Sequence, residues 1–345
     1  MIKDFFKKTD INKSLIGITV VLYLLMYLCG VLFFGDQGFT KPQVFLNIFI
    51  NNAGLIVTSA AMTMVMISGG IDISVGAMTA LNSVILGDLM MNHGWNAWAA
   101  MAAVLLVGII HGFIQGFFIS YLRLQPFAVT LVGMFFCRGL AAVISSEVIS
   151  VTEKTFTAIS QYKINIIFLG RLNKHGKMIY PFIYPSVIIA LLLVLLVFLM
   201  LRYTAFGRSI YAVGGNERAA TLMGLNVRKI ILRTYMIDGF LVSVGGILFC
   251  MNTMSCFSDQ AKGLEMDAIA STVVGGTLLD GGVGNVFGTL LGCMIKGTSE
   301  TFISFDGSLS SWWVKISTAV LLSFFILLQS FLRVRSAKEC SVENL

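Results

Sequence analysis

The residues of this sequence that could do chemistry are ionisable side chains inside long apolar runs. Such groups are costly in hydrocarbon and persist mainly where they pair with one another or serve a function. Lys296 and Glu300 stand four positions apart, the spacing of neighbours on one helix face, so we expect a structural ion pair. Arg138 has no such local partner, so we expect a carboxylate from another helix beside it.

Asp72 has two open interpretations. It follows the pair Gly69-Gly70, which breaks an apolar run, and it precedes Ser74. A carboxylate in this place can cap the helix that starts after the break, because its oxygens accept backbone N–H groups. It can instead face a polar pathway through the membrane.

The sequence contains no recognisable constellation for catalysis, for a metal or for a nucleotide. The three histidines show no HExxH spacing and the six cysteines no CxxC pair. Residues 276–283 have the glycines of a phosphate-binding loop but lack the Lys and Ser/Thr that reach phosphate and magnesium. We therefore expect no catalytic residue, no metal site and no cofactor bound by this chain.

The composition indicates which elements hold these side chains. Hydrophobic residues make up 57% of the 345 residues and charged residues 12%. Soluble domains carry about 25% charged residues, so we exclude a soluble globular, a disordered and a disulfide-rich secreted protein. Because about 20 apolar residues span a bilayer core, we predict an all-α polytopic membrane protein. About ten segments fit, some broken or re-entrant, at 14–34, 44–68, 73–91, 97–122, 127–145, 182–201, 230–251, 268–279, 286–303 and 312–332.

The basic residues predict the orientation in the membrane. With the N-terminus inside, cytoplasmic segments hold 14 Lys and Arg and the opposite side holds 7, which is the usual cytoplasmic bias. We assign the net charge of +7 to this bias and not to nucleic-acid binding. Both termini are then cytoplasmic. The predicted parts are an N-terminal segment 1–13, a transmembrane domain 14–332, an extracytoplasmic loop 146–180, a cytoplasmic loop 202–228 and a cytoplasmic tail 333–345.

The cytoplasmic loop 202–228 contains a short helix with both ends marked. Asn216 can cap its start, Glu217 complements the positive helix end, and Gly224 suits the left-handed position that stops a helix. Leu222 and Met223 share an apolar face with Ala219. Two turns are too short to be stable alone, so we expect this helix to dock into a partner. A helix lying on the lipid surface is the alternative.

Several motifs resemble those of one transporter family. Residues 206–217 (FGRSIYAVGGNE) resemble the coupling-loop signature of ribose/xylose/galactoside-type ABC importer permeases. Residues 68–76 (SGGIDISVG) are similar to that family's GGIDLSVG, with Ile73 in place of Leu. The segments 125–140 and 265–284 resemble two further blocks in the same order, so the likeness spans about residues 45–330. The ending at 305–313 looks most like the second permease of galactofuranose-type importers.

The resemblance implies a dimer of permeases, homo or hetero, around a central pathway. It implies a cytoplasmic ABC ATPase with two fused nucleotide-binding domains, which holds ATP and magnesium, and an extracytoplasmic sugar-binding protein. The membrane would be the bacterial inner membrane, and the cargo a monosaccharide such as a furanose, ribose, xylose or galactose. The residues that match the coupling helix are Gly215, Asn216, Glu217, Ala219, Ala220, Leu222, Met223 and Gly224.

A pathway for neutral sugars needs amides, hydroxyls and aromatic faces more than charge. The candidates within the predicted spans are Asn52, Asp72, Asn82, Gln115 and Arg138. For each amide, packing between helices is an equally good interpretation. An ion-coupled secondary transporter that uses Asp72, Arg138 or Glu300 is the alternative function. A membrane enzyme acting on a lipid-linked sugar lacks the catalytic cluster that it would need.

Overall fold

A computed structural model of the chain describes residues 2–172, 178–310 and 312–342. Met1, residues 173–177 of the predicted outer loop and residues 343–345 of the predicted tail lie outside the described part. The elements, in chain order, are α1 Ile2–Phe34, α2 Pro42–Ile67, α3 Val75–Met91, α4 Ala97–Ser120, α5 Pro126–Ile144, β1 Ile149–Ser150, α6 Lys154–Ser160, β2 Ile164–Asn165, the 3₁₀ helix η1 Ile167–Leu169, β3 Arg171–Leu172, β4 Met178–Ile179, β5 Phe182–Ile183, α7 Pro185–Tyr203, α8 Ala205–Gly215, α9 Glu217–Leu222, α10 Val227–Thr253, β6 Ser255–Cys256, α11 Leu264–Val274, α12 Val286–Asp306 and α13 Trp312–Val342.

Local sequence sets where many of these helices begin. Helices α2, α5 and α7 each start with a proline, whose fixed φ suits the first helical position and whose missing N–H has no helical partner to lose. Asn96 and Asn285 begin α4 and α12 by accepting the backbone N–H two residues further on. The helices therefore start at residues that satisfy or dispense with the unpaired N–H groups of a helix end.

A helix forms at each of the ten predicted segments, but the count of ten spans is not confirmed. Among the described residues, seven helices are long and apolar enough to cross a membrane: α1, α2, α4, α5, α7, α10 and α13. Helix α3 has 17 residues and α11 has 11. The 11 residues of α11 make a helix about 16 Å long, which is about half the thickness of a bilayer core. Helix α12 has 21 residues but carries Lys296, Glu300 and Asp306.

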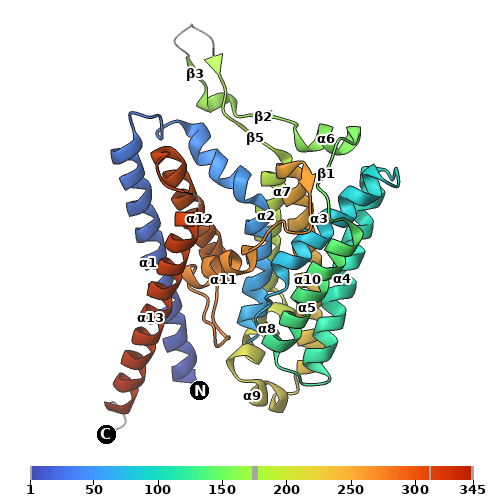
Figure 1. Cartoon of the computed structure of the whole chain (residues 1–345). Coiled ribbons are helices and arrows are strands. Elements are labelled where there is room, and N and C mark those ends of the chain that lie inside the picture. The colour runs from blue at the N-terminus through green and yellow to red at the C-terminus, as the bar shows by residue number, and fades with distance from the viewer. Residues whose placement is uncertain (1, 173–177, 311, 343–345) are drawn as a thin grey trace.

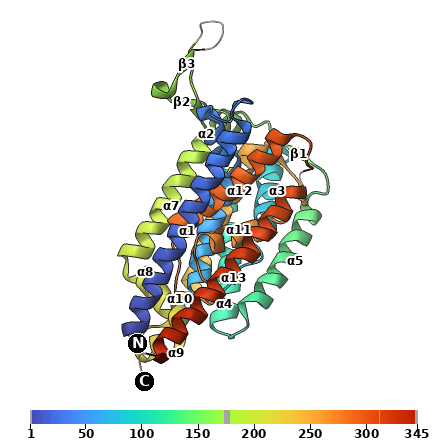
Figure 2. The same cartoon turned by 90° about the vertical axis from the view of Figure 1, so that its left-hand side faces the viewer.

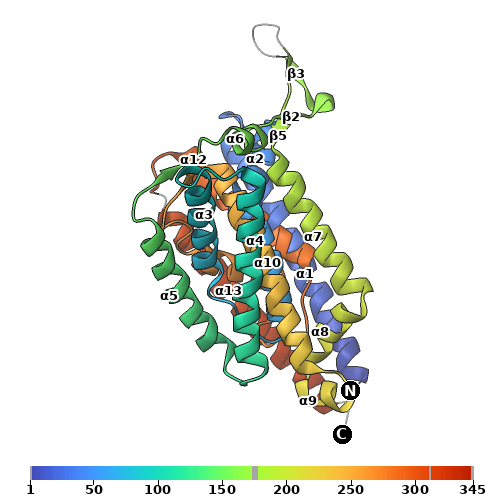
Figure 3. The same ribbon diagram turned by 90° about the vertical axis from the view of Figure 1, so that its right-hand side faces the viewer.

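The helices form a bundle in which α2 and α10 are central and α1 and α13 lie along one side (Figures 1 and 2). Figure 3 shows α4 against α10 along most of its length. Glycines allow this close approach, because a Cβ on Gly112 of α4 would overlap the Tyr235 carbonyl oxygen of α10. Apolar side chains on the outside of the bundle are exposed, as Phe135 and Phe136 on α5 show.

The two ends of the bundle differ. Strands β1 and β6, β2 and β5, and β3 and β4 pair as three short antiparallel ladders at one end. At that end Glu153 caps α6 by accepting the Phe156 N–H at 2.6 Å, and this hydrogen bond holds the pKa of the carboxyl below its usual value. Helix α9, the start of α1 and the end of α13 lie at the other end (Figure 1). The predicted coupling helix and the outer ends of both terminal helices thus lie at the same end of the bundle.

Candidate functional site

Helix α9 has the two marked ends that its sequence predicts. The Asn216 Oδ1 accepts the Ala219 N–H at 3.0 Å, and the Asn216 N–H donates to the Ala212 carbonyl at the end of α8. At the other end Gly224 has a φ of +82°, its N–H donates to the Thr221 carbonyl at 3.0 Å, and the Leu225 N–H reaches Ala220. These two bonds form the Schellman motif that ends a helix at a left-handed glycine.

The outer face of α9 is apolar and unusually exposed. Leu222 is 89% exposed and Met223 65%, whereas Ala220 is fully buried and fixes the helix to the protein. Glu217 occupies the first turn, beside the positive helix end. Exposed apolar side chains on a helix that is held at both ends are typical of a surface that binds a partner. The lipid surface stays open as an alternative site of binding.

Helix α8 connects α9 to the interior. The Tyr211 O–H donates to the Gly284 carbonyl at 2.8 Å, and burial of this side chain raises its pKa to about 12. An open cavity of about 790 Å³ lies between α9 and the turn that joins α4 to α5, with Glu217, Thr221, Arg123 and Tyr235 in its wall. The side of α9 that carries Glu217 and Thr221 therefore borders a cavity with both polar and apolar residues in its wall, while Leu222 and Met223 are exposed.

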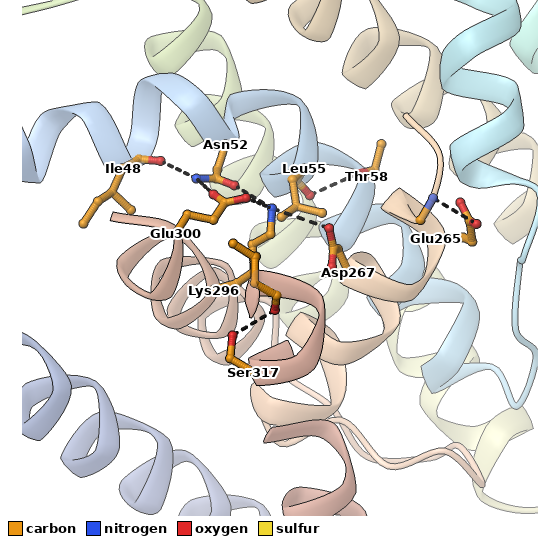
Figure 4. A network of polar contacts seen from close by, with 11 residues as sticks. Ile48, Asn52, Leu55, Thr58, Glu265, Asp267, Lys296, Glu300 and Ser317 are labelled. Carbon is orange, nitrogen blue, oxygen red and sulfur yellow. Dashed lines mark hydrogen bonds and ion pairs between the residues drawn. The ribbon is translucent and has the colours of Figure 1, made fainter. Parts of the chain in front are cut away.

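A second polar site lies where α2, α11 and α12 meet (Figure 4). The Lys296 Nζ is 2.5 Å from the Glu300 carboxylate and 3.5 Å from that of Asp267 on α11. Asn52 of α2 joins them: its amide N–H donates to Glu300 at 3.3 Å and its carbonyl oxygen accepts from Lys296 at 3.4 Å. We call these four residues the polar cluster.

The polar cluster contains one ammonium group and two carboxyl groups in a largely buried setting. The Lys296 side chain is 12% exposed, and those of Asp267 and Glu300 are 25% and 35% exposed. A buried charge is tolerated when it is paired and hydrogen-bonded. The pairing of Lys296 with Glu300 follows the predicted i, i+4 contact. Asp267 was missed, because its partner stands 29 positions away on another helix and no local spacing marks the pair.

Asp72 and Gln115, two of the predicted pathway residues, are brought together by Ser74. The Asp72 Oδ1 accepts the Ser74 N–H at 2.7 Å and the Ser74 O–H at 2.6 Å, directly before α3 begins. The Gln115 amide donates to the Ser74 Oγ at 2.9 Å. The carboxylate of Asp72, which is 2% exposed, thus holds the residue before α3 and not an N–H of α3 itself, and both interpretations of Asp72 stay predictions. These contacts join the broken end of α2, the start of α3 and helix α4.

The other two candidates lie apart from these groups. Asn82 is fully buried in α3 and donates to the Ser243 Oγ of α10 at 3.0 Å, a contact between helices. Arg138 donates to the carbonyl oxygens of Ser258 and Gln260 at 2.8 and 2.7 Å. Two loop carbonyls accept these bonds, and the Asp259 carboxylate of the same loop interacts electrostatically with Arg138; a carboxylate from another helix is not among these partners. None of the five pathway candidates is in the wall of the cavity beside α9, and their contact with a substrate stays a prediction.

Metal binding can be assessed only for the described residues. Within residues 2–172, 178–310 and 312–342 there is no group of three or more His, Cys, Asp or Glu that could hold a metal ion. The nearest cysteines are Cys250 and Cys256, whose sulfur atoms lie 3.1 Å apart. The chemistry that the described sites offer is hydrogen bonding and charge pairing.

Comparisons with known proteins agree with the motifs. The family described as the permease component of the branched-chain amino acid transport system matches residues 44–328.

The chain is 38% identical to the inner membrane ABC transporter permease protein YjfF of Escherichia coli K12, over 92% of each chain. It is 33% identical to the fructose import permease FruG of Bifidobacterium longum, over 90% of this chain and 88% of FruG. It is 32% identical to the ribose import permease RbsC of E. coli K12, over 92% and 93%. No solved structure matches significantly. These matches confirm the resemblance that the motifs indicate.

Proposed function

The chain belongs to the family of branched-chain amino acid transport system permease components, and from this premise we propose that it imports a monosaccharide as the membrane subunit of an ABC importer. As a permease it is a transporter subunit and not an enzyme. The curated relatives import ribose in one case and fructose in another. A sugar of this size, in furanose or pyranose form, is the proposed cargo, with xylose and galactose as further candidates. The site of action is the bacterial inner membrane.

The observation that carries the proposal is the construction of α9. Its start and end are fixed by Asn216 and Gly224, its inner residue Ala220 is buried, and its outer residues Leu222 and Met223 face outward. A two-turn helix of this kind can move as one body when a partner pushes on it. We propose that this partner is a cytoplasmic ATPase with two fused nucleotide-binding domains, which binds ATP and magnesium.

The proposed cycle is alternating access. Closure of the ATPase displaces α9, the attached helices tilt, and the pathway opens to one side and then to the other. A second permease, identical or related, completes the pathway, and an extracytoplasmic binding protein delivers the sugar. The exposed apolar sides of α1, α5 and α13 face lipid or that second permease. In this orientation α9, the start of α1 and the end of α13 lie on the cytoplasmic side.

The proposal is tested by purifying the tagged chain from its native membrane in mild detergent and identifying the recovered partners by mass spectrometry. The recovered complex is then placed in liposomes with ATP inside or outside, the sugar-binding protein is added, and uptake of radiolabelled D-ribose, D-fructose and D-galactose is measured. We expect recovery of a two-domain ATPase and ATP-dependent uptake of one sugar.

The secondary-transporter alternative predicts a different result. The purified chain would be recovered alone and would transport in liposomes without ATP when an ion gradient is applied. The Asp72→Asn and Glu300→Gln variants would then abolish coupling to the gradient. Family membership does not favour this alternative, and gradient-driven uptake by the isolated chain would overturn the importer proposal.

A further inference from the structure

Three glycine pairs from distant parts of the chain meet beside α9. They are residues 69–70 after α2, residues 214–215 at the end of α8, and residues 281–282 in the loop between α11 and α12. Their main chains touch without intervening side chains, and the Gly282 N–H donates to the Ile67 carbonyl of α2 at 2.8 Å. We call these six residues the glycine junction.

Glycine is required at the contact points of the glycine junction. A Cβ on Gly214 would overlap the Ile67 carbonyl oxygen and lie 2.8 Å from the Gly282 nitrogen. A Cβ on Gly282 would lie 2.7 Å from the Gly215 Cα, and one on Gly281 would lie 2.8 Å from the Gly69 Cα. All of these separations are shorter than van der Waals contact. Gly215 differs, since nothing lies within 4 Å of a Cβ at that position.

The glycine junction connects α9 to each helix that builds the polar cluster. On one side, α8 ends at Gly215 and the next residue, Asn216, caps α9. On the other side the junction contacts the end of α2 and the loop that leaves α11 and enters α12. Helix α2 carries Asn52, α11 carries Asp267, and α12 carries Lys296 and Glu300. The Tyr211–Gly284 hydrogen bond adds a second contact between α8 and the same loop.

Main-chain contact transmits displacement differently from side-chain contact. A side chain between two elements can change rotamer and absorb a shift, whereas closely packed backbones must move together or separate. The three segments of the glycine junction have no side chains at their contact points, so movement of α8 is passed on to the neighbouring main chains.

We propose that the glycine junction carries the displacement of α9 into α2, α11 and α12, with Gly214 and Gly282 as positioning residues for transport. The inference rests on the proposed importer function. It places the mechanical link in three glycine motifs that are far apart in the sequence. The polar cluster is the region of the membrane domain that this displacement reaches.

The experiment compares Gly214→Ala with Gly17→Ala in the complex recovered with the native ATPase. Both glycines lie inside helices, α8 and α1, and both variants gain the same methyl group, but nothing lies within 4 Å of a Cβ at Gly17. Sugar uptake, ATP hydrolysis and recovery of the ATPase are measured in the same liposomes. We expect Gly214→Ala to keep the ATPase bound and hydrolysing but to lower uptake per ATP at least tenfold. Gly17→Ala should stay within twofold of the parent protein.

Each outcome decides the inference. Equal uptake per ATP in the two variants, with both correctly assembled, would overturn it. If Gly214→Ala fails to assemble, Tyr211→Phe decides, because it removes only the hydroxyl that donates to Gly284. Tyr211→Phe should lower uptake per ATP by about twofold or more, and unchanged coupling would refute the link. Failure of the importer proposal looks different, since the parent protein itself would then show no ATP-dependent uptake.

Discussion

Helix α9 and the polar cluster each depart from the usual rule that apolar side chains are buried and charged side chains are exposed. Helix α9 turns Leu222 and Met223 outward, and the cluster keeps Lys296 and two carboxyl groups largely inside. An exposed apolar side chain adds little to folding but offers a binding surface. A buried charge stabilises only while its partners are present. The two regions should therefore respond to substitution in opposite ways, α9 in partner binding and the cluster in stability.

The largest effect is expected from Lys296→Met. This change leaves the carboxyl groups of Glu300 and Asp267 without their ammonium partner. Removing one partner of a buried pair costs about 3–5 kcal/mol, and the partial exposure of Glu300 favours the lower end of that range. The melting temperature in detergent, followed by tryptophan fluorescence, should fall by roughly 5 °C or more.

Lys262→Met is the matched control, because Lys262 pairs with Asp259 on the surface, where both side chains are more than half exposed. Solvent screens such a surface pair, so the melting temperature should hardly change. Equal shifts for Lys296→Met and Lys262→Met would show that the polar cluster does not behave as a buried site.

The next effect is expected from the double change Leu222→Ser with Met223→Ser. Both side chains are exposed, so the melting temperature should stay the same. Loss of an apolar contact centre typically weakens an interface by 1–2 kcal/mol or more, which is about tenfold in affinity. Titration of the purified ATPase onto the immobilised permease measures this. Leu309→Ser, an exposed change in the loop after α12, should leave binding intact. Unchanged ATPase binding by the double variant would favour the lipid-surface interpretation of α9.

A smaller effect is expected from Gly224→Val. The φ of +82° at this position costs about 1–2 kcal/mol for a residue with a side chain, so the end of α9 should unwind. Uptake should fall several-fold while membrane insertion and melting temperature are kept. Gly224→Asn should retain most activity, since asparagine tolerates the left-handed conformation. Equal activity of the valine and asparagine variants would mean that the ordered end of α9 is not needed.

The smallest effect concerns Glu153 at the opposite end of the bundle. Its folded-state pKa lies below the ordinary value of 4.5, because the carboxylate accepts the Phe156 N–H. The stability that this hydrogen bond gives to α6 is therefore complete above about pH 4.5. It is lost as the pH falls through the lower folded-state pKa of Glu153. Hydrogen exchange in α6 should show this acid loss, and Glu153→Gln should remove it. The difference in the stability of α6 between the parent protein and Glu153→Gln should stay below about 1 kcal/mol at this exposed site. Identical pH profiles of the two proteins would contradict the role of Glu153 as the cap of α6.

Features set by neighbouring residues were predicted from the sequence. Asn216 and Gly224 mark the ends of α9 through bonds that span three to five residues, and Lys296 reaches Glu300 across one helical turn. A helix also appears at each of the ten apolar segments, since hydrophobic runs and proline or asparagine starts are local signals. Whether α3, α11 and α12 span a membrane depends on the length of each helix and on the helices packed around it. The hydrophobic runs in the sequence do not determine either of these.

Features that depend on packing between distant segments were not predicted. Asn52 meets Lys296 and Glu300 across more than 240 positions, so a residue assigned to the pathway lies in the polar cluster. Arg138 finds loop carbonyls, which every residue carries and which no side-chain pattern can mark. The glycine pairs at 69–70 and 281–282 were recognised within sequence motifs, but their contact was not predicted, because a contact between main chains leaves no signature in either segment alone.

The single residue between α8 and α9 has a consequence for the length of this loop. Asn216 uses its N–H to finish α8 and its side chain to begin α9, so the two helices share one linker residue. An inserted residue would separate these two tasks and turn α9 by about 100° around its axis. A deletion would leave one helix end without its cap. We therefore expect natural and engineered relatives to vary in side chains here but to keep the residue count between Gly215 and Glu217 unchanged.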